Sequence, residues 1–262
     1  MEMKLALIPP FSGMHFLTSA YSYHMMLPQL VHNPLYAEKY RHLSQGHFVM
    51  MDNGAAESKM LNNKDLMEVA SEYKPSELIL PDIKGDALGT LSLIKEFLSL
   101  RPRHNLYPDM SLVAVAQGRT GIELQRMIEV IADMRRVTTI GIPRHLLATI
   151  GNNAARLTLA KWITKRYNHR FEIHFLGAAP AWPYEIFFAR ELGIVRSMDT
   201  SMPFNYALNN LALRDDRLNI ARPDNYFEAE FTVQQDELAR RNCTIMHQWA
   251  TGVQSYDRIT ES

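Results

Sequence analysis

A single (β/α)8 barrel is the fold class that this sequence predicts. The chain has 262 residues, and barrels of roughly 250 residues commonly form one domain. Short apolar runs recur at intervals of roughly 20 to 40 residues, with helical periodicity between them. Because parallel strands need crossover helices, this alternation predicts repeated βα units. The expected strands lie at 5–8, 48–51, 78–80, 112–116, 139–142, 173–176 and 194–198, with a less regular one around 218–221.

Five of the intervals between these strands contain a segment with the spacing of an amphipathic helix. The segment 64–73 follows Asn62 and Asn63, which are suitable helix caps. The segment 91–100 stops before Pro102, and 121–135 places its apolar residues largely on one side. Segments 153–167 and 183–192 have similar spacing. An open doubly wound sheet is the alternative, although no reversal point can be located in the chain.

The carboxyl-terminal part, residues 222–262, differs from the repeated units. Arg222-Pro223-Asp224 interrupts the pattern, and residues 233–241 have helical spacing. We expect a closing helix with a frayed tail, because no linker marks a second domain. Residues 1–262 are therefore interpreted as one domain.

Composition excludes several classes of protein. Hydrophobic residues make up 47% of the chain, but no apolar run reaches the ~18 residues of a membrane span, and no signal-peptide pattern is found. The expected location is the cytoplasm, that of the host if the protein is viral. The single cysteine, Cys243, excludes an intramolecular disulfide and a Cys-rich zinc site. No P-loop or GxGxxG motif occurs.

The formal net charge is zero, so binding to nucleic acid requires a local basic surface. Residues 134–171 contain no Asp or Glu, which is typical of a phosphate-binding surface. The alternative is a solvated helix face whose charge is balanced by acidic residues elsewhere. The basic side chains of this segment are Arg135, Arg136, Arg144, Arg156, Lys161, Lys165, Arg166 and Arg170.

Polar residues and glycines stand where the expected strands end. In a barrel the carboxyl ends of all strands open at one mouth, and parallel α/β proteins place their chemistry there. The set therefore predicts one pocket for a polar, planar ligand that lies against exposed backbone. Each member taken alone is also explained as a turn or a helix cap. The set comprises Asp52, Asp82, Gln117, Gly118, Gly141, Gly177 and Asp199.

These strand ends resemble the motifs of the queuine and archaeosine tRNA-guanine transglycosylases, which are barrel enzymes. The resemblance runs from about residue 47 to about residue 204. The segment Asp52-Asn53-Gly54-Ala55 is similar to the family's Asp-Ser-Gly-Gly, and Gln117-Gly118 is similar to its Val-Gln-Gly. Gly141-Ile142 resembles a Gly-Leu pair, Leu176-Gly177 resembles a Met-Gly pair, and Asp199 matches the nucleophilic Asp before a short loop with proline.

The resemblance implies a role for each matched residue. Asp199 attacks C1′ of the nucleotide, and Asp52 serves as general acid and base. Asp82 and Gln117 bind the Watson–Crick edge and the exocyclic amine of the base. The remaining matched residues, Gly118, Gly141, Ile142, Leu176 and Gly177, line the base site and offer backbone groups. No metal or organic cofactor is implied.

Three departures from the family's pattern decide which of its branches the chain resembles more closely. The zinc site Cys-x-Cys-x2-Cys with a distant His is absent, because Cys243 is the only cysteine. Ala56 replaces the aromatic residue that stacks on the base, so Leu176 and either Phe204 or Phe11 are expected to enclose it. The chain is also short and has no added RNA-binding domain. It resembles more closely the compact, zinc-free DNA 7-deazaguanine transglycosylases of phages and bacteria.

This closer resemblance implies exchange of guanine in DNA for a 7-deazaguanine base such as preQ0. A duplex hides C1′, so the nucleotide is expected to be flipped out. Within the basic segment, Arg144-His145 lies nearest the expected mouth. The expected phosphate contacts are Arg135, Arg136, Arg144, Lys161, Lys165 and Arg166.

Two alternatives stay open. The first is a transglycosylase that acts on tRNA. The second is a non-catalytic partner subunit that binds nucleic acid, although retention of both Asp52 and Asp199 argues against it. A metal-dependent barrel hydrolase is less favoured than either, because the ten histidines form no His-x-His or HExxH motif.

Overall fold

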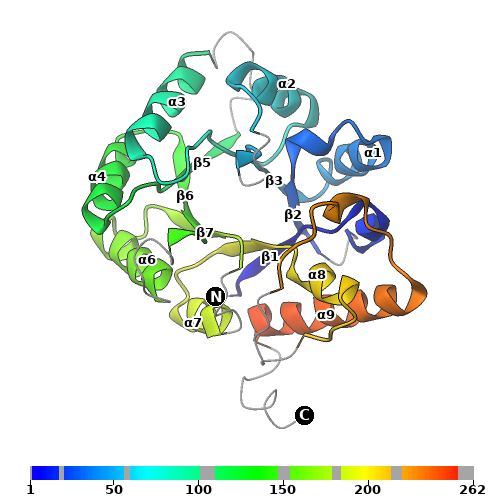
Figure 1. Ribbon diagram of the computed structural model, residues 1–262. Helices are drawn as coiled ribbons and strands as arrows, with labels where there is room; N and C mark the ends of the chain where they lie inside the picture. Colours follow the sequence, from blue (N-terminus) through cyan, green and yellow to red (C-terminus); the bar gives the residue numbers. More distant parts are fainter. Residues whose placement is uncertain are drawn as a thin grey trace.

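The computed structural model describes residues 2–17, 21–55, 60–100, 110–146, 154–178, 184–213 and 220–252. Eight parallel strands form a closed barrel, in which each strand pairs with the next and the last pairs with the first. Figure 1 shows the helices arranged around this barrel. The strands are β1 (Lys4–Leu7), β2 (Tyr23–Met26), β3 (Phe48–Met51), β4 (Glu77–Ile79), β5 (Ser111–Val115), β6 (Val137–Pro143), β7 (Glu172–Leu176) and β8 (Ser197–Thr200).

Helices cover the outside of the barrel (Figure 1). The α-helices are α1 (Pro34–Leu43), α2 (Asn63–Tyr73), α3 (Ala87–Leu100), α4 (Gly121–Ala132), α6 (Ala155–Arg166), α7 (Tyr184–Leu192), α8 (Met202–Leu208) and α9 (Val233–Thr251), and three 3-10 helices are η1 (Phe11–Phe16), η2 (Pro28–Leu30) and η5 (Tyr226–Glu228). Asn62 caps α2 and Thr120 caps α4, each by accepting hydrogen bonds from backbone N–H groups of the first turn. Within the described ranges, no helix is both long and apolar enough to cross a membrane.

The predicted barrel is confirmed, and the open-sheet alternative is wrong because β1 pairs with both β2 and β8. The seven strands expected from apolar runs are all present. The eighth expected strand, around 218–221, is wrong. Residues 220 and 221 are not in a strand, and residues 218 and 219 lie outside the described part of the chain. The missing strand is β2, at the other end of the sequence.

Strand β2 was not predicted because its unit lacks the usual pattern. The described part of the connection from β1 contains the 3-10 helix η1 and no α-helix. The strand itself includes His24, a polar residue that is nevertheless fully buried. A search for apolar runs separated by amphipathic helices passes over such a unit.

The segment after β8 is a helix, α8, and not the short loop with proline that the resemblance implies. Pro203 lies in the first turn of α8, where its missing N–H leaves no hydrogen bond unmade. Helix α9 begins at Val233 as expected but continues to Thr251, and Gly252 ends it with a φ of 88°. Figure 1 shows α9 beside α8, and α9 also packs against α7 and β1. The closing helix is therefore part of the barrel's outer layer.

The strand register decides which side chains face the barrel interior. Because side chains alternate along a strand, Ser197 and Asp199 point to one side of β8. Tyr23 on β2 reaches Ser197 across the intervening strand β1, with 2.9 Å between the hydroxyl oxygens. That contact places this side of β8 in the interior. His174 on β7 joins the same group, because its Nδ1 lies 2.8 Å from Ser197 Oγ.

Arg156 in α6 is a buried cation that ties the outer helices to the ends of two strands. Its guanidinium pairs with the buried carboxylate of Glu185 in α7. It also donates to three carbonyl oxygens at the ends of β6 and β7, those of Ile142, Leu176 and Gly177. Arg156 therefore does not belong to a phosphate-binding surface, and this part of the sequence-based interpretation is wrong.

Replacing Arg156 with Met is expected to lower the free energy of unfolding by about 3–5 kcal/mol, because the buried Glu185 carboxylate loses the guanidinium. Urea unfolding of the wild type and the variant measures the loss. Lys161→Met, an exposed position on the same helix, is the matched control and should change stability by less than about 0.5 kcal/mol. Equal losses of stability at the two positions would contradict the structural role of the Arg156–Glu185 ion pair.

Candidate active site

Four polar side chains from four strand ends meet at the carboxyl-terminal mouth of the barrel. Asp52 follows β3, Asp82 follows β4, Gln117 follows β5, and Asp199 lies in β8. Gln117 Nε2 donates to Asp82 Oδ2, and the charges of Asp199 and Asp82 both act on Asp52. The three carboxylates have exposed fractions of only 8%, 8% and 9%. The structure thus brings together residues that the sequence places far apart.

Asp52 is set up to hold or release a proton near neutral pH. Burial, and after it the nearby charge of Asp199, raise the pKa of its carboxyl group to about 7. Backbone N–H groups of Asn53 and Gly54 oppose this rise by hydrogen bonding to the carboxylate. A carboxyl group with this pKa can act as a general acid or a general base without a metal ion.

The raised pKa of Asp52 makes folding stability depend on pH. An Asp in the unfolded chain has a pKa of about 3.9, so the folded state favours protonated Asp52. The contribution is fully present below about pH 4 and is lost as the pH rises through about 7. Asp52→Asn should therefore gain stability relative to the wild type between about pH 4 and pH 8, on the order of 4 kcal/mol. Urea unfolding of both proteins at the two pH values measures this gain. A stability difference between variant and wild type that is the same at both pH values would contradict the prediction.

Asp199 is held through one of its two oxygens. His174 Nε2 lies 3.1 Å and Gly177 N lies 2.9 Å from the same atom, Asp199 Oδ1. Gly177 has a φ of +71°, which a residue with a side chain rarely adopts. In the described part of the chain no hydrogen bond reaches Oδ2. The carboxylate therefore keeps one oxygen available to a substrate.

Asp82 is the centre of an amide cluster. Its Oδ1 accepts from Asn53 Nδ2 at 2.6 Å, and its Oδ2 accepts from Gln117 Nε2. Burial raises the pKa of Asp82, and these two amide hydrogen bonds oppose the rise. Each carboxylate oxygen still has a lone pair for a further donor. The cluster is suited to a ligand edge that carries N–H groups.

The amide of Gln117 is oriented by its neighbours. Its Oε1 accepts from Gly85 N at 2.8 Å and lies 3.0 Å from His145 Nε2. Burial and the nearby charge of Lys84 lower the pKa of His145 to about 4. The imidazole is therefore neutral at pH 7, and its Nε2 must carry the hydrogen that Gln117 Oε1 accepts.

Gly141 provides space inside the barrel. A Cβ at this position would lie 3.1 Å from Leu176 Cδ1, so glycine leaves room beside that side chain. The carbonyl oxygen of Gly141 accepts from Ala116 N, and that of Ile142 accepts from Arg156 Nη1. These two carbonyl groups are thus used within the fold, and the expected contact of the Gly141-Ile142 backbone with the base stays a prediction.

Gly118 and Phe204 serve packing at the positions where the structure places them. A Cβ at Gly118 would lie 3.1 Å from the backbone nitrogen of Leu124 in α4, so this glycine lets the strand end approach the helix. Phe204 is 0% exposed and packs beside Phe16 and Phe231. It therefore does not line the mouth, and its expected role in enclosing a base is wrong.

Phe11 and Leu176 are the other two residues that were expected to enclose the base. Phe11 is half-buried beside Tyr36 and Phe227. Leu176 is half-buried at the end of β7. Ala56 lies outside the described residues. Leu176 is thus the one proposed enclosing residue that the structure places next to both Gly141 and Gly177.

The predicted basic surface does not gather at the mouth. Arg135 and Arg136 stand before β6, and Lys165 and Arg166 end α6. Because the helices of a barrel run back from the mouth, these four residues lie at the opposite end from Asp199. Lys161 is exposed in the middle of α6. Arg144, which directly follows β6 and is exposed, is the one of the six expected phosphate contacts at the mouth.

Sequence reasoning missed the residues that hold the carboxylates in place. His174 hydrogen-bonds to both Asp199 and Ser197, and Asn53 donates a hydrogen bond to Asp82. One signal was available for His174, because it stands two positions before Leu176 and so faces the same side of its strand. Among the described residues, no group of three or more His, Cys, Asp and Glu side chains could hold a metal ion.

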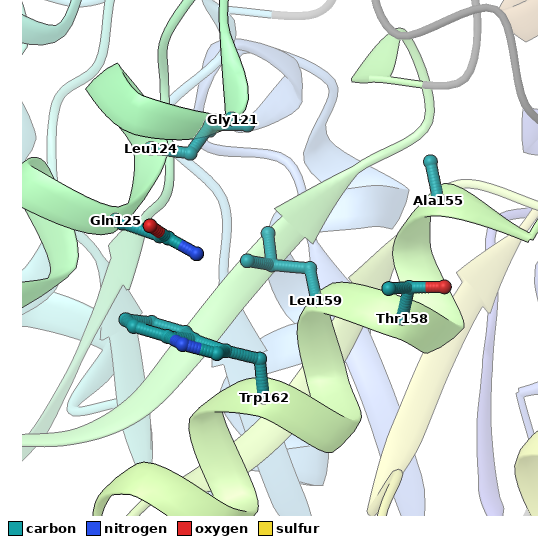
Figure 2. Close-up of a pocket in the computed structure, with 7 residues that line it drawn as sticks. All are labelled: Gly121, Leu124, Gln125, Ala155, Thr158, Leu159 and Trp162. Atoms are coloured by element: carbon teal, nitrogen blue, oxygen red, sulfur yellow. The ribbon is translucent and has the colours of Figure 1, made fainter.

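A separate cavity of about 270 Å³ lies between α4 and α6, outside the barrel. Figure 2 shows Leu124, Leu159 and Trp162 directed into it from the two helices. None of the predicted site residues lines this cavity. Its lining consists of Gly121, Leu124, Gln125, Ala155, Thr158, Leu159 and Trp162.

Comparison with known proteins finds no matching family model and no matching curated protein. The solved structures that match include RipC from Yersinia pestis, with 10% identity, 98% of each chain covered and a TM-score of 0.47. An isomerase from Streptomyces coelicolor A3(2) is 12% identical over 93% of this chain and 65% of its own, also with a TM-score of 0.47. A protein from Anabaena variabilis ATCC 29413 described as a sugar phosphate isomerase/epimerase is 9% identical over 97% and 100%, with a TM-score of 0.47. The strand pairing of this chain itself forms the closed barrel.

Proposed function

We propose that this protein exchanges guanine in DNA for a 7-deazaguanine base through a covalent aspartyl-glycosyl intermediate. The observation that carries the proposal is the pair of buried carboxylates at one mouth, Asp52 with a pKa of about 7 and Asp199 acting on it. Two carboxyl groups with different environments can divide the roles of proton carrier and nucleophile. The sequence resemblance to DNA 7-deazaguanine transglycosylases adds support.

The first half of the exchange breaks the bond between the sugar and guanine. Oδ2 of Asp199 attacks C1′ of a flipped-out deoxyguanosine, and the bond between C1′ and N9 breaks. Its electron pair passes to the guanine, which takes the proton from Asp52. Guanine then leaves as a neutral base, and the deoxyribose is held on Asp199 as an ester.

The second half installs the new base. The incoming 7-deazaguanine gives its N9 proton to Asp52, and N9 attacks C1′ from the side that guanine left. The bond between C1′ and Asp199 breaks, and the carboxylate is restored. Both residues end in their starting state, so the proposed cycle needs no net supply of protons or electrons.

Base recognition is assigned to Asp82 and Gln117. Guanine and 7-deazaguanine both carry an N1–H and an exocyclic amine on one edge, and the buried Asp82 carboxylate can accept from both groups. Asn53 and Gln117 hold that carboxylate from the other side. Arg144, exposed at the mouth, is the proposed phosphate contact.

The test is exchange of labelled guanine. The purified chain is mixed with duplex DNA or with tRNA that contains labelled guanine, and preQ0 is supplied as the incoming base. The proposal expects label release from DNA, together with a deazapurine nucleoside in the DNA digest. Release from tRNA alone would favour the tRNA alternative, and binding of DNA without any release would favour the non-catalytic subunit.

A further inference from the structure

A line of hydrogen bonds runs through the barrel interior and ends on Asp199. Arg196 Nη2 donates to the Tyr23 hydroxyl at 3.0 Å, and that hydroxyl lies 2.9 Å from Ser197 Oγ. Ser197 Oγ lies 2.8 Å from His174 Nδ1, and His174 Nε2 lies 3.1 Å from Asp199 Oδ1. His174 and Ser197 are 0% exposed. The line therefore reaches Asp199 from behind and does not contact solvent there.

The far end of the line is fixed by an ion pair. Glu77 Oε1 and Oε2 accept from Arg196 Nη1 and Nη2 at 2.9 and 2.6 Å. Thr139 Oγ1 donates to the same Glu77 carboxylate at 2.9 Å. A two-point pair between guanidinium and carboxylate fixes orientation as well as distance. Arg196 is thus held in the position from which it donates to Tyr23.

The two ends of the line determine the direction of every hydrogen bond in it. Arg196 can only donate, so the Tyr23 oxygen accepts from it and its own hydrogen is directed to Ser197. Burial raises the pKa of Tyr23, so the phenol keeps that hydrogen. Ser197 Oγ also accepts from Arg196 Nε at 3.4 Å, which leaves the Ser197 hydrogen for His174 Nδ1.

His174 is the last member of the line before the carboxylate. With Nδ1 accepting from Ser197, the hydrogen of a neutral imidazole is on Nε2, where it is donated to Asp199 Oδ1. Gly177 N donates to the same oxygen. Hydrogen bonds that run in one direction polarise one another in a buried setting. The arrangement defines one oxygen of Asp199 as an anchored atom.

We infer that His174 is a positioning residue, held as its Nε2–H tautomer by the line from Arg196, and that it anchors Asp199 Oδ1 so that Oδ2 is the reacting oxygen. The tautomer and the anchoring rest on the hydrogen bonds alone. The step performed by Oδ2 rests on the proposed function. An Asp199 carboxylate that rotated freely would direct either oxygen toward the substrate. The anchored carboxylate directs only Oδ2 toward it, in a single orientation.

The tautomer is tested by NMR of the 15N-histidine-labelled protein at neutral pH. The His174 signals are identified by their loss in His174→Gln. The expected spectrum has a protonated Nε2 and an unprotonated Nδ1 for this ring. Tyr23→Phe removes one hydroxyl from the line, and we expect the Nδ1 resonance of His174 to shift, because Ser197 loses one of its hydrogen-bond donors. A protonated Nδ1 in the wild type, or a spectrum unchanged by Tyr23→Phe, would overturn the inference.

The anchoring is tested by a matched pair of variants. In His174→Gln the side-chain amide can replace Nε2 and still donate to Asp199. In His174→Asn the shorter amide can reach Ser197 but not Asp199. We expect Asn to lower kcat for base exchange about 10- to 100-fold with KM unchanged, the effect of losing one hydrogen bond to a charged group, and Gln to restore most of the rate.

Equal kcat losses in His174→Gln and His174→Asn, or a change confined to KM, would overturn the anchoring role. Circular dichroism and urea unfolding of both variants exclude misfolding as the cause. If the wild type exchanges no base, the proposed function fails while the NMR result still decides the inference. The two ideas can therefore fail separately.

Discussion

Replacing Asp199 with Asn is expected to abolish base exchange and the covalent DNA adduct, with a loss in kcat of about 10⁴-fold or more. The amide is nearly the same size as the carboxylate. Its oxygen can still accept from His174 Nε2 and Gly177 N, which leaves the NH2 group where Oδ2 stood. An amide nitrogen cannot attack C1′, so the site keeps its shape and loses its nucleophile. Denaturing gels and mass spectrometry of quenched reactions detect the adduct.

DNA binding is the control for the Asp199 variant. We expect Asp199→Asn to bind DNA about as tightly as the wild type, because phosphate contacts dominate affinity and Asp199 makes none. Asp65→Asn, at an exposed acid in α2, should exchange bases at the wild-type rate. An adduct that persists in Asp199→Asn would assign the nucleophile elsewhere. Unchanged function in that variant is what the non-catalytic alternative expects.

The barrel could be predicted because its signals are local and repeated. Seven strands are short buried runs, and the helices between them bury one face. Each unit can therefore be recognised from its local hydrophobic pattern. The position of Asp52, Asp82, Gln117 and Asp199 at one mouth then follows from topology, since the carboxyl ends of parallel barrel strands share one face. Convergence of residues up to 147 positions apart therefore needs no long-range information beyond the fold.

The parts that failed depend on information that a single sequence does not carry. Strand β2 is recognised by its pairing with β1 and β3, and not by its own composition. Arg156 has the same formal charge as its exposed neighbours, but it faces inward and pairs with Glu185, which lies in another helix. Charge counts along a segment do not distinguish an inward guanidinium from an outward one.

The hydrogen-bonded line behind Asp199 also could not be predicted from the sequence. Tyr23, His174 and Ser197 are separated in sequence and belong to no shared motif. The register between β7 and β8 sets His174 opposite Ser197, and Tyr23 on β2 reaches Ser197 across β1. Motif reasoning finds groups that touch a ligand more readily than the groups that orient them, because the second kind depends on packing.

Asp52→Asn is expected to lower kcat/KM for base exchange by about 10²- to 10⁴-fold, the usual contribution of a general acid or base. The pH dependence gives the sharper result. Burial raises the pKa of Asp52 to about 7, and departure of guanine needs the protonated form. The wild-type kcat/KM should therefore fall as the pH rises through about 7, whereas the variant should show no such fall. Initial rates of label release between about pH 5.5 and pH 9 measure both profiles.

The two asparagine variants together separate the roles of the carboxylates. Asp199→Asn removes the charge that helps to raise the pKa of Asp52, so titration of Asp52 in that inactive variant should shift to lower pH, as followed by 13C NMR of labelled aspartate. Asp52→Asn should still form some covalent adduct, because Asp199 keeps its nucleophilic oxygen and only protonation of the leaving base is impaired. If Asp52→Asn keeps the wild-type pH profile, the proton carrier is another group. If Asp52 titrates identically with and without the Asp199 charge, the two carboxylates do not act on the same sugar carbon.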